Sequence, residues 1–106
     1  MNPSVELLWW EGCPSTTAAR ELLARVLVEE GLDPAAIELR EVSTADDSER
    51  LRFVGSPTIR VGGREVAPEP QEPVALTCRV YHLRDGRVSP TPDPEDIRAA
   101  IREAVG

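Results

Sequence analysis

Two cysteines are the residues of this chain best suited to covalent chemistry, and Cys13 is the better placed of the two. It follows the apolar run Val5–Trp10 and a glycine, and Pro14 behind it opens a helical pattern. A cysteine between a strand end and a helix start faces free backbone N–H groups and the positive end of the helix dipole, which favour its thiolate. We therefore expect Cys13 to be a nucleophile. The alternative is a buried structural thiol at the strand end.

The position of Cys78 depends on the register of the strands that precede it. If Gly62-Gly63 closes a tight hairpin turn, the chain returns toward Cys13 and Cys78 begins its strand close by. If the two glycines belong to a long loop, Cys78 pairs near Val61. Four residues at about 3.3 Å each then place it roughly 13 Å from Pro57, beyond disulfide reach. The glycine pair favours the first register, in which Cys78 is a redox partner of Cys13.

The alternative for Cys78 is a packing role. Leu76, Cys78 and Val80 share one parity, so Cys78 fits a small apolar residue on the core face of a strand. Two cysteines cannot form a four-thiolate zinc site, and His82 is expected to be a solvent-facing strand residue, so no zinc site is predicted. The acidic residues are scattered over solvated helix positions and form no general acid and base pair.

Composition limits the classes of function. The chain has 106 residues, enough for a single domain over residues 1–106 with a modest core. A formal net charge of −7 argues against nucleic-acid binding, because phosphates would be repelled. No apolar run approaches the roughly 20 residues needed to cross a bilayer. We therefore expect a cytoplasmic protein without a membrane partner, and its oligomeric state stays open. Nothing indicates a cofactor.

The hydrophobic pattern predicts an α/β chain in which helices cover both faces of a mixed sheet. The first strand, helix and strand must cross over right-handed, which makes the two strands parallel, and the later hairpin adds antiparallel strands. The predicted strands are 5–10, 37–42, 58–61, 64–67 and 76–83, with a loop at 68–73 and a hairpin turn at 85–86. The first predicted helix runs from Pro14 to a stop at Gly31. A short helix at 45–52 is capped by Ser43 or Thr44, and a closing helix at 94–105 is capped by Asp93.

This element order, together with two motifs, resembles the thioredoxin-like superfamily, which includes thioredoxins and glutaredoxins. The motifs are Trp-Trp-Glu-Gly-Cys-Pro-Ser-Thr at 9–16 and Gly-Ser-Pro-Thr at 55–58, and the resemblance covers residues 4–66 and 94–105. It implies that Cys13 matches the attacking cysteine and that Pro14 matches the proline that follows it in glutaredoxins. It also implies that Pro57 is the cis proline facing the site, with Ser56 before it.

The sequence departs from the superfamily pattern at Thr16, where the second cysteine of Cys-x-x-Cys would stand. The usual dithiol cycle between those two positions is therefore lost. The threonine hydroxyl is expected to hydrogen-bond the Cys13 sulfur and tune it. Trp9 and Trp10 have opposite strand parities, so one is expected in the core and Trp10 beside the cleft.

We therefore expect thiol–disulfide exchange with a protein or a low-molecular-weight thiol or disulfide. Cys13 would be the nucleophile, resolved by Cys78 or by an external thiol. Ser56 and Pro57 would present backbone groups to an extended substrate. One alternative is a soft-metal or organomercurial binder using Cys13 and Cys78, since thiolates suit soft metals. Another is a non-catalytic module that binds a protein through the cleft of Trp10 and Pro57.

Overall fold

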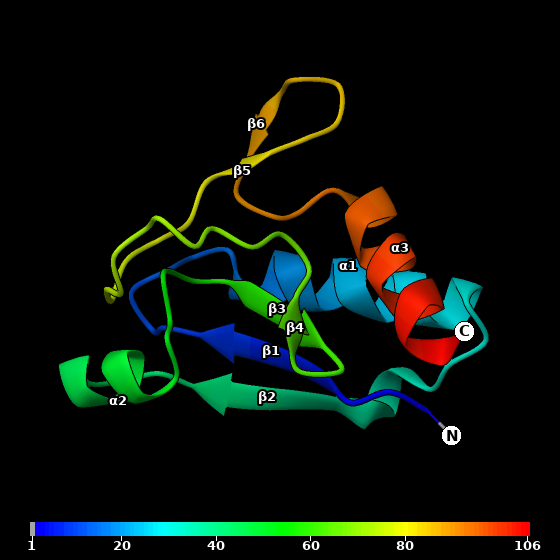
Figure 1. Cartoon of the computed structure of the whole chain (residues 1–106), viewed down its shortest axis with the longest axis horizontal. Coiled ribbons are helices and arrows are strands. Elements are labelled where there is room, and N and C mark those ends of the chain that lie inside the picture. The colour runs from blue at the N-terminus through cyan, green and yellow to red at the C-terminus, as the bar shows by residue number, and fades with distance from the viewer. Residues whose placement is uncertain (1) are drawn as a thin grey trace.

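The computed structural model describes residues 2–106 and contains a four-stranded mixed sheet with three helices (Figure 1). The sheet order is β2-β1-β3-β4, and a separate two-stranded ribbon is formed by β5 and β6. The strands are β1 (Val5–Trp9), β2 (Ile37–Glu41), β3 (Thr58–Val61), β4 (Arg64–Glu65), β5 (Tyr81–His82) and β6 (Val88–Ser89). The helices are α1 (Thr16–Glu29), α2 (Ala45–Arg50) and α3 (Pro94–Val105). A 3₁₀ turn, η1 (Pro34–Ala36), precedes β2.

The strand pairing follows the order predicted from the sequence. β1 and β2 are parallel, as the helix between them requires. β3 lies antiparallel on the other side of β1, with Leu7 opposite Ile59. Gly62 and Gly63 both have positive φ, +60° and +81°, and turn the chain so that Arg60 pairs with Glu65. The tight-hairpin register is therefore confirmed, and the long-loop register is wrong.

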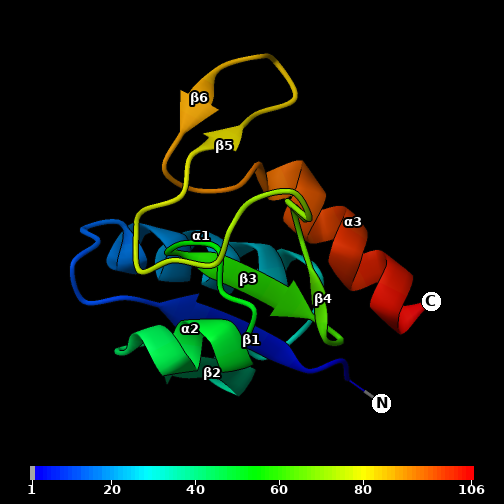
Figure 2. The ribbon, with the colours of Figure 1, turned by 60° about the vertical axis from the view of Figure 1, so that its left-hand side comes forward.

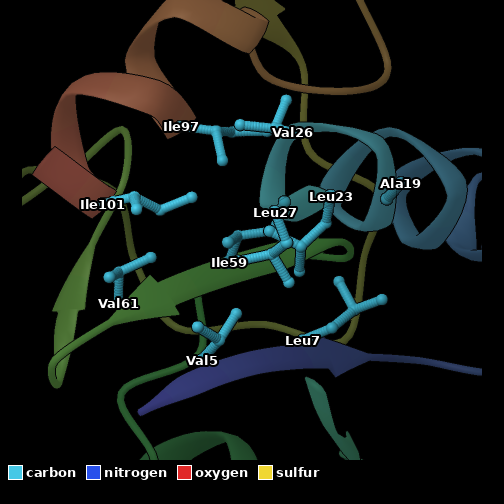
Figure 3. Close-up of a cluster of buried hydrophobic side chains, with 10 residues drawn as sticks. All are labelled: Val5, Leu7, Ala19, Leu23, Val26, Leu27, Ile59, Val61, Ile97 and Ile101. Carbon is cyan, nitrogen blue, oxygen red and sulfur yellow. The ribbon is translucent and has the colours of Figure 1, made fainter. Parts of the chain in front are cut away.

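Most of the core lies between the sheet and the pair of helices α1 and α3. Apolar side chains from β1, β3 and both helices point toward one another in this layer (Figure 3). The buried members are Val5, Leu7, Ala19, Leu23, Val26, Leu27, Ile59, Val61, Ile97 and Ile101. A smaller cluster is formed by Leu8, Val42 and Phe53. The short helix α2 lies on the other side of the sheet from α1 and α3 (Figure 2). Leu7 and Leu8 near the end of β1, and Ala19 in the first turn of α1, are fully buried in these clusters.

Several predicted helix ends are confirmed. Thr44 caps α2 by accepting from the Asp47 N–H, and Asp93 caps α3 by accepting from the Glu95 N–H. Gly31 adopts φ +77° after α1, and the Leu32 N–H then donates to the Leu27 carbonyl, as in a Schellman ending.

The start of α1 differs from the expectation. Pro14 was expected in the first helical turn, but α1 begins at Thr16 and Ser15 is its N-cap residue. Pro14 lies instead in the turn before the helix, and β1 ends one residue early, at Trp9. The loop between strand and helix is therefore longer than the sequence pattern indicated, and Cys13 lies within this loop.

The predicted strand at 76–83 is mostly wrong. Only Tyr81 and His82 form a strand, pairing with β6 in a small ribbon that projects from the rest of the chain in both views (Figures 1 and 2). The expected core face of this segment, with Leu76, Cys78 and Val80, is also wrong. Arg79 and Tyr81 are buried, whereas Val80 is 57% exposed. Before this ribbon, the chain makes one isolated parallel bridge, between Cys78 and Ser56.

Candidate functional site

Cys13 lies at the end of a tight turn that leaves β1. Its N–H donates to the Trp10 carbonyl at 3.0 Å, so the chain reverses through Glu11 and Gly12. The Trp10 indole lies against Gly12, where an added Cβ would be only 2.3 Å from the ring. Glycine at this position therefore leaves room for the indole where it lies. Cys13 is 6% exposed, as the structural-thiol alternative expects, but it is a member of neither apolar cluster.

The loop before β3 packs directly against Cys13. The Ser56–Pro57 peptide bond is cis, which confirms the expectation for this proline. The Ser56 hydroxyl accepts from the Trp10 N–H at 3.0 Å, and the Ser56 carbonyl accepts from the Cys13 thiol at 3.4 Å. Two hydrogen bonds thus join the β1 end to residues 55–57, which we call the proline loop. In the sequence, 43 residues separate Cys13 from Ser56. The proline loop forms one wall of the site.

Cys78 lies beside the same loop. The Ser56 N–H donates to the Thr77 carbonyl at 2.7 Å, and the Arg79 N–H donates to the Ser56 carbonyl at 2.8 Å. Cys78, between these two residues, is thereby held across Ser56, and its thiol interacts with the Cys13 sulfur. Both cysteines are free thiols, and Cys78 is exposed. The expectation that Cys78 packs on the core face is wrong.

The two thiols are electrostatically unlike. Burial raises the pKa of Cys13, but the Ser15 N–H, the Cys78 thiol and the Ser56 and Ser15 side chains hydrogen-bond its sulfur and lower the pKa below its ordinary value overall. The hydrogen bond with Cys13 raises the pKa of Cys78, and burial and the negative charge of Cys13 add to the rise. As the pH rises, Cys13 therefore loses its proton before Cys78 does.

A buried arginine fixes the segment that carries Cys78. The Arg79 guanidinium pairs with Glu65 at 2.8 Å and donates to the Thr58 hydroxyl at 3.2 Å. It also lies over the Tyr81 ring, 4.5 Å from the centroid. Burial raises the pKa of Tyr81, and its protonated hydroxyl donates to the Pro57 carbonyl. The sequence analysis did not predict this network. The only local signal is that Arg79 and Tyr81 share one strand parity, opposite to that of Cys78.

Thr16 does not have the role expected of it. Its hydroxyl is buried and has no hydrogen-bond partner within residues 2–106. The expectation that it bonds the Cys13 sulfur is therefore wrong, and Ser15 and Ser56 supply the hydroxyl contacts instead. Pro14 is exposed on the loop beside Cys13. Trp10 is half-buried, and its indole packs against Gly12 and the Leu8 cluster.

Ser56 offers no free backbone to a substrate. Its N–H and carbonyl are both engaged by the segment at 77–79 of the same chain. The expectation that Ser56 presents these groups to an extended substrate is wrong for this structure, because a substrate strand would have to displace Thr77 and Arg79. This occupancy also weakens the case for a protein-binding module built on the proline loop.

Other features of the molecule lie outside the site. A cavity of about 670 Å³ lies between the β3–β4 hairpin and α3, is lined by Val61, Arg64 and Ala100 among others, and includes neither cysteine. Within residues 2–106, no three His, Cys, Asp or Glu side chains gather closely enough to hold a metal ion. His82 is exposed in β5, as expected.

Each helix within residues 2–106 is too short or too polar to cross a membrane. Comparison of the chain with known protein families, curated proteins and solved structures finds no match. The case for function therefore depends on the geometry around Cys13, Ser56 and Cys78.

Proposed function

We propose that this chain is a thioredoxin-like thiol–disulfide exchange protein whose redox pair is Cys13 and Cys78. The observation that supports the pair most directly is the bridge between Ser56 and Cys78, which holds the second thiol against the first. Cys78 would thus replace the cysteine missing at Thr16. It comes from a distant segment of the chain, not from the first turn of α1.

The arrangement of the elements supports the thioredoxin-like part of this proposal. The order β2-β1-β3-β4, with only β1 and β2 parallel, places the β1–α1 junction beside the loop before β3. That junction holds Cys13, and that loop holds the cis Ser56–Pro57 bond. The superfamily to which the sequence motifs pointed uses the same two places for its active cysteine and its proline.

The chemistry is an exchange of two electrons with an external disulfide. One thiolate of the pair attacks the external disulfide, forms a mixed disulfide and releases one external thiolate. The other thiolate attacks the protein sulfur of that mixed disulfide, closes the Cys13–Cys78 bond and releases the second external thiolate. The protein loses two electrons and two protons, and the external disulfide becomes two thiols. The lowered pKa of Cys13 supplies a thiolate below the ordinary thiol pKa.

Disulfide mapping tests the pair. The reduced chain would be oxidised with glutathione disulfide, blocked with an alkylating agent and cut with trypsin, which cleaves after Arg20, Arg64 and Arg79. We expect peptide 1–20 to be cross-linked to peptide 65–79. Alkylation of both cysteines after oxidation, or two separate glutathione adducts, would contradict the proposal.

A relocated thiol provides the matched control. In the double variant Cys78→Ser with Val80→Cys, the thiol moves two residues along the exposed side of the same segment, about 6–7 Å away. We expect no cross-link to Cys13 in this variant, because only position 78 lies across Ser56. Cross-linking at the same rate as in the unchanged chain would mean that the fixed geometry is irrelevant.

Binding of a soft metal ion is the second candidate. Two adjacent sulfurs, one with a lowered pKa, match the ligand preference of soft ions such as Hg(II). Titration of the reduced chain and of Cys78→Ser with Hg(II), alongside the disulfide mapping, separates the candidates. A tight equivalent that is lost in the variant, without any internal disulfide in the mapping, would favour the metal.

A further inference from the structure

The two sulfurs differ in their access to solvent. Cys13 is 6% exposed and is hydrogen-bonded to the Trp10 and Ser56 carbonyls, whereas Cys78 is exposed. An attacking thiolate must approach a disulfide sulfur directly and expel the other sulfur. Only Cys78 offers an open approach in the present arrangement.

The wall of the site also limits what can bind there. A substrate that pairs as an extended strand needs the N–H and carbonyl of Ser56, and the segment at 77–79 uses both. Arg79, whose side chain is 4% exposed and paired with Glu65, anchors this segment. A partner with no need for backbone pairing, such as a small thiol, meets no such obstacle.

From this geometry we infer that external thiols enter and leave the site at Cys78, and that they are low-molecular-weight thiols of the glutathione type. The inference rests on the proposed Cys13–Cys78 pair. It reverses the roles expected from the sequence, in which Cys13 makes the mixed disulfide and Cys78 resolves it.

Reduction of the internal disulfide proceeds in two exchanges. An external thiolate attacks the Cys78 sulfur of the internal disulfide, a bond forms between these two sulfurs, and the electron pair of the broken bond leaves on Cys13. A second external thiolate attacks the external sulfur of the mixed disulfide and releases Cys78, which takes up a proton. Two thiols become one disulfide, and the protein disulfide becomes a dithiol. In the reverse direction, the Cys13 thiolate is the internal nucleophile that closes the bond.

The electrostatics agree with this direction of attack. A thiol with a lower pKa is the better leaving group in thiol–disulfide exchange. The hydrogen bonds around Cys13 lower its pKa, whereas contact with Cys13 raises the pKa of Cys78. Access and leaving-group quality therefore both select Cys78 as the sulfur that is attacked.

A trapping experiment locates the mixed disulfide. The oxidised chain would be mixed with reduced glutathione, quenched rapidly with acid, alkylated and cut with trypsin. We expect the glutathione adduct on peptide 65–79, in excess over peptide 1–20 by on the order of tenfold or more. A predominant adduct on peptide 1–20 would overturn the inference. Absence of the internal disulfide in the starting material would instead overturn the proposed function.

Single-cysteine variants give an independent measurement. Glutathione disulfide should modify Cys78 in Cys13→Ser faster, per thiolate, than it modifies Cys13 in Cys78→Ser. An unstructured peptide with one cysteine should reduce the oxidised chain no faster per thiolate than glutathione, because Ser56 cannot pair with it. Faster modification of Cys13, or a peptide with a large advantage, would contradict the entry site or the small-thiol class respectively.

Discussion

The two sulfurs lie in regions of the molecule that are built differently. Cys13 follows a central strand and precedes a 14-residue helix, and both elements are held by the main apolar core. Cys78 lies in an irregular segment that is attached by backbone hydrogen bonds to Phe53 and Ser56 and by the buried Arg79. The first thiol is therefore positioned by the main core, whereas the second is positioned by a few backbone hydrogen bonds and one buried ion pair.

The largest effect is therefore expected from Arg79→Met. Removing the guanidinium leaves the Glu65 carboxylate without its closest partner, and we expect a loss of about 3 kcal/mol in the free energy of unfolding. Internal disulfide formation should slow by more than about tenfold, since the segment loses its anchor. Urea unfolding and the rate of peptide cross-linking measure the two effects.

Arg64→Met is the matched control for Arg79→Met. Arg64 also pairs with a glutamate, Glu103, but both side chains are largely exposed, at 83% and 74%. We expect little change in stability or in cross-linking rate. If Arg79→Met behaves like this control, Cys78 is not positioned by the buried arginine.

A smaller effect is expected from Gly55→Ala, which disturbs Arg79 from the other side. Gly55 has φ +146°, and an added Cβ would lie 2.5 Å from the Arg79 Cγ. We expect a loss of about 2 kcal/mol in the free energy of unfolding, together with slower cross-linking. Gly63→Ala, at φ +81° with nothing within 4 Å of the Cβ, keeps the backbone strain and lacks the contact. It should leave the cross-linking rate unchanged.

The coupling between the thiols predicts a change in titration. The Cys13 hydrogen bond is the main cause of the raised pKa of Cys78. In Cys13→Ala the pKa of Cys78 should fall toward its ordinary value, so that the Cys78 thiolate forms at lower pH. Thiolate absorbance in the ultraviolet against pH measures this shift. An unchanged or higher pKa would mean that the thiols do not interact.

The smallest effects concern the hydroxyls beside Cys13. Ser15→Ala removes a hydrogen bond that lowers the pKa of Cys13, so this pKa should rise. Thr16→Val removes a buried hydroxyl that has no partner within residues 2–106. It should leave the pKa unchanged, and the free energy of unfolding should stay the same or increase by up to about 1 kcal/mol. A shift of the Cys13 titration in Thr16→Val but not in Ser15→Ala would reverse these assignments.

The difference between the two regions also explains what the sequence could predict. The first strand, its helix, the Gly62-Gly63 hairpin and the Asp93 cap follow from local signals that each involve a few neighbouring residues. The segment with Cys78 has no regular pairing, so its hydrophobic alternation suggested a strand and placed Cys78 on the wrong side.

The site could be predicted only in part for a similar reason. The meeting of Cys13 with Ser56 and Pro57 follows from the order of the strands. The burial of Arg79 depends on Glu65 and on the Thr58 hydroxyl, which lie 14 and 21 residues away and become neighbours only after folding. A charged residue in a polar stretch gives no local sign of such burial.

A redox equilibrium titration tests the central claim most directly. The chain would be equilibrated in glutathione buffers of increasing oxidation, and its free thiols would be counted by mass after alkylation. We predict that Cys13 and Cys78 disappear together in one two-electron transition, leaving an unmodified internal disulfide. Loss of one thiol at a time, with glutathione retained on the chain at equilibrium, would contradict the claim that these two cysteines form a redox pair.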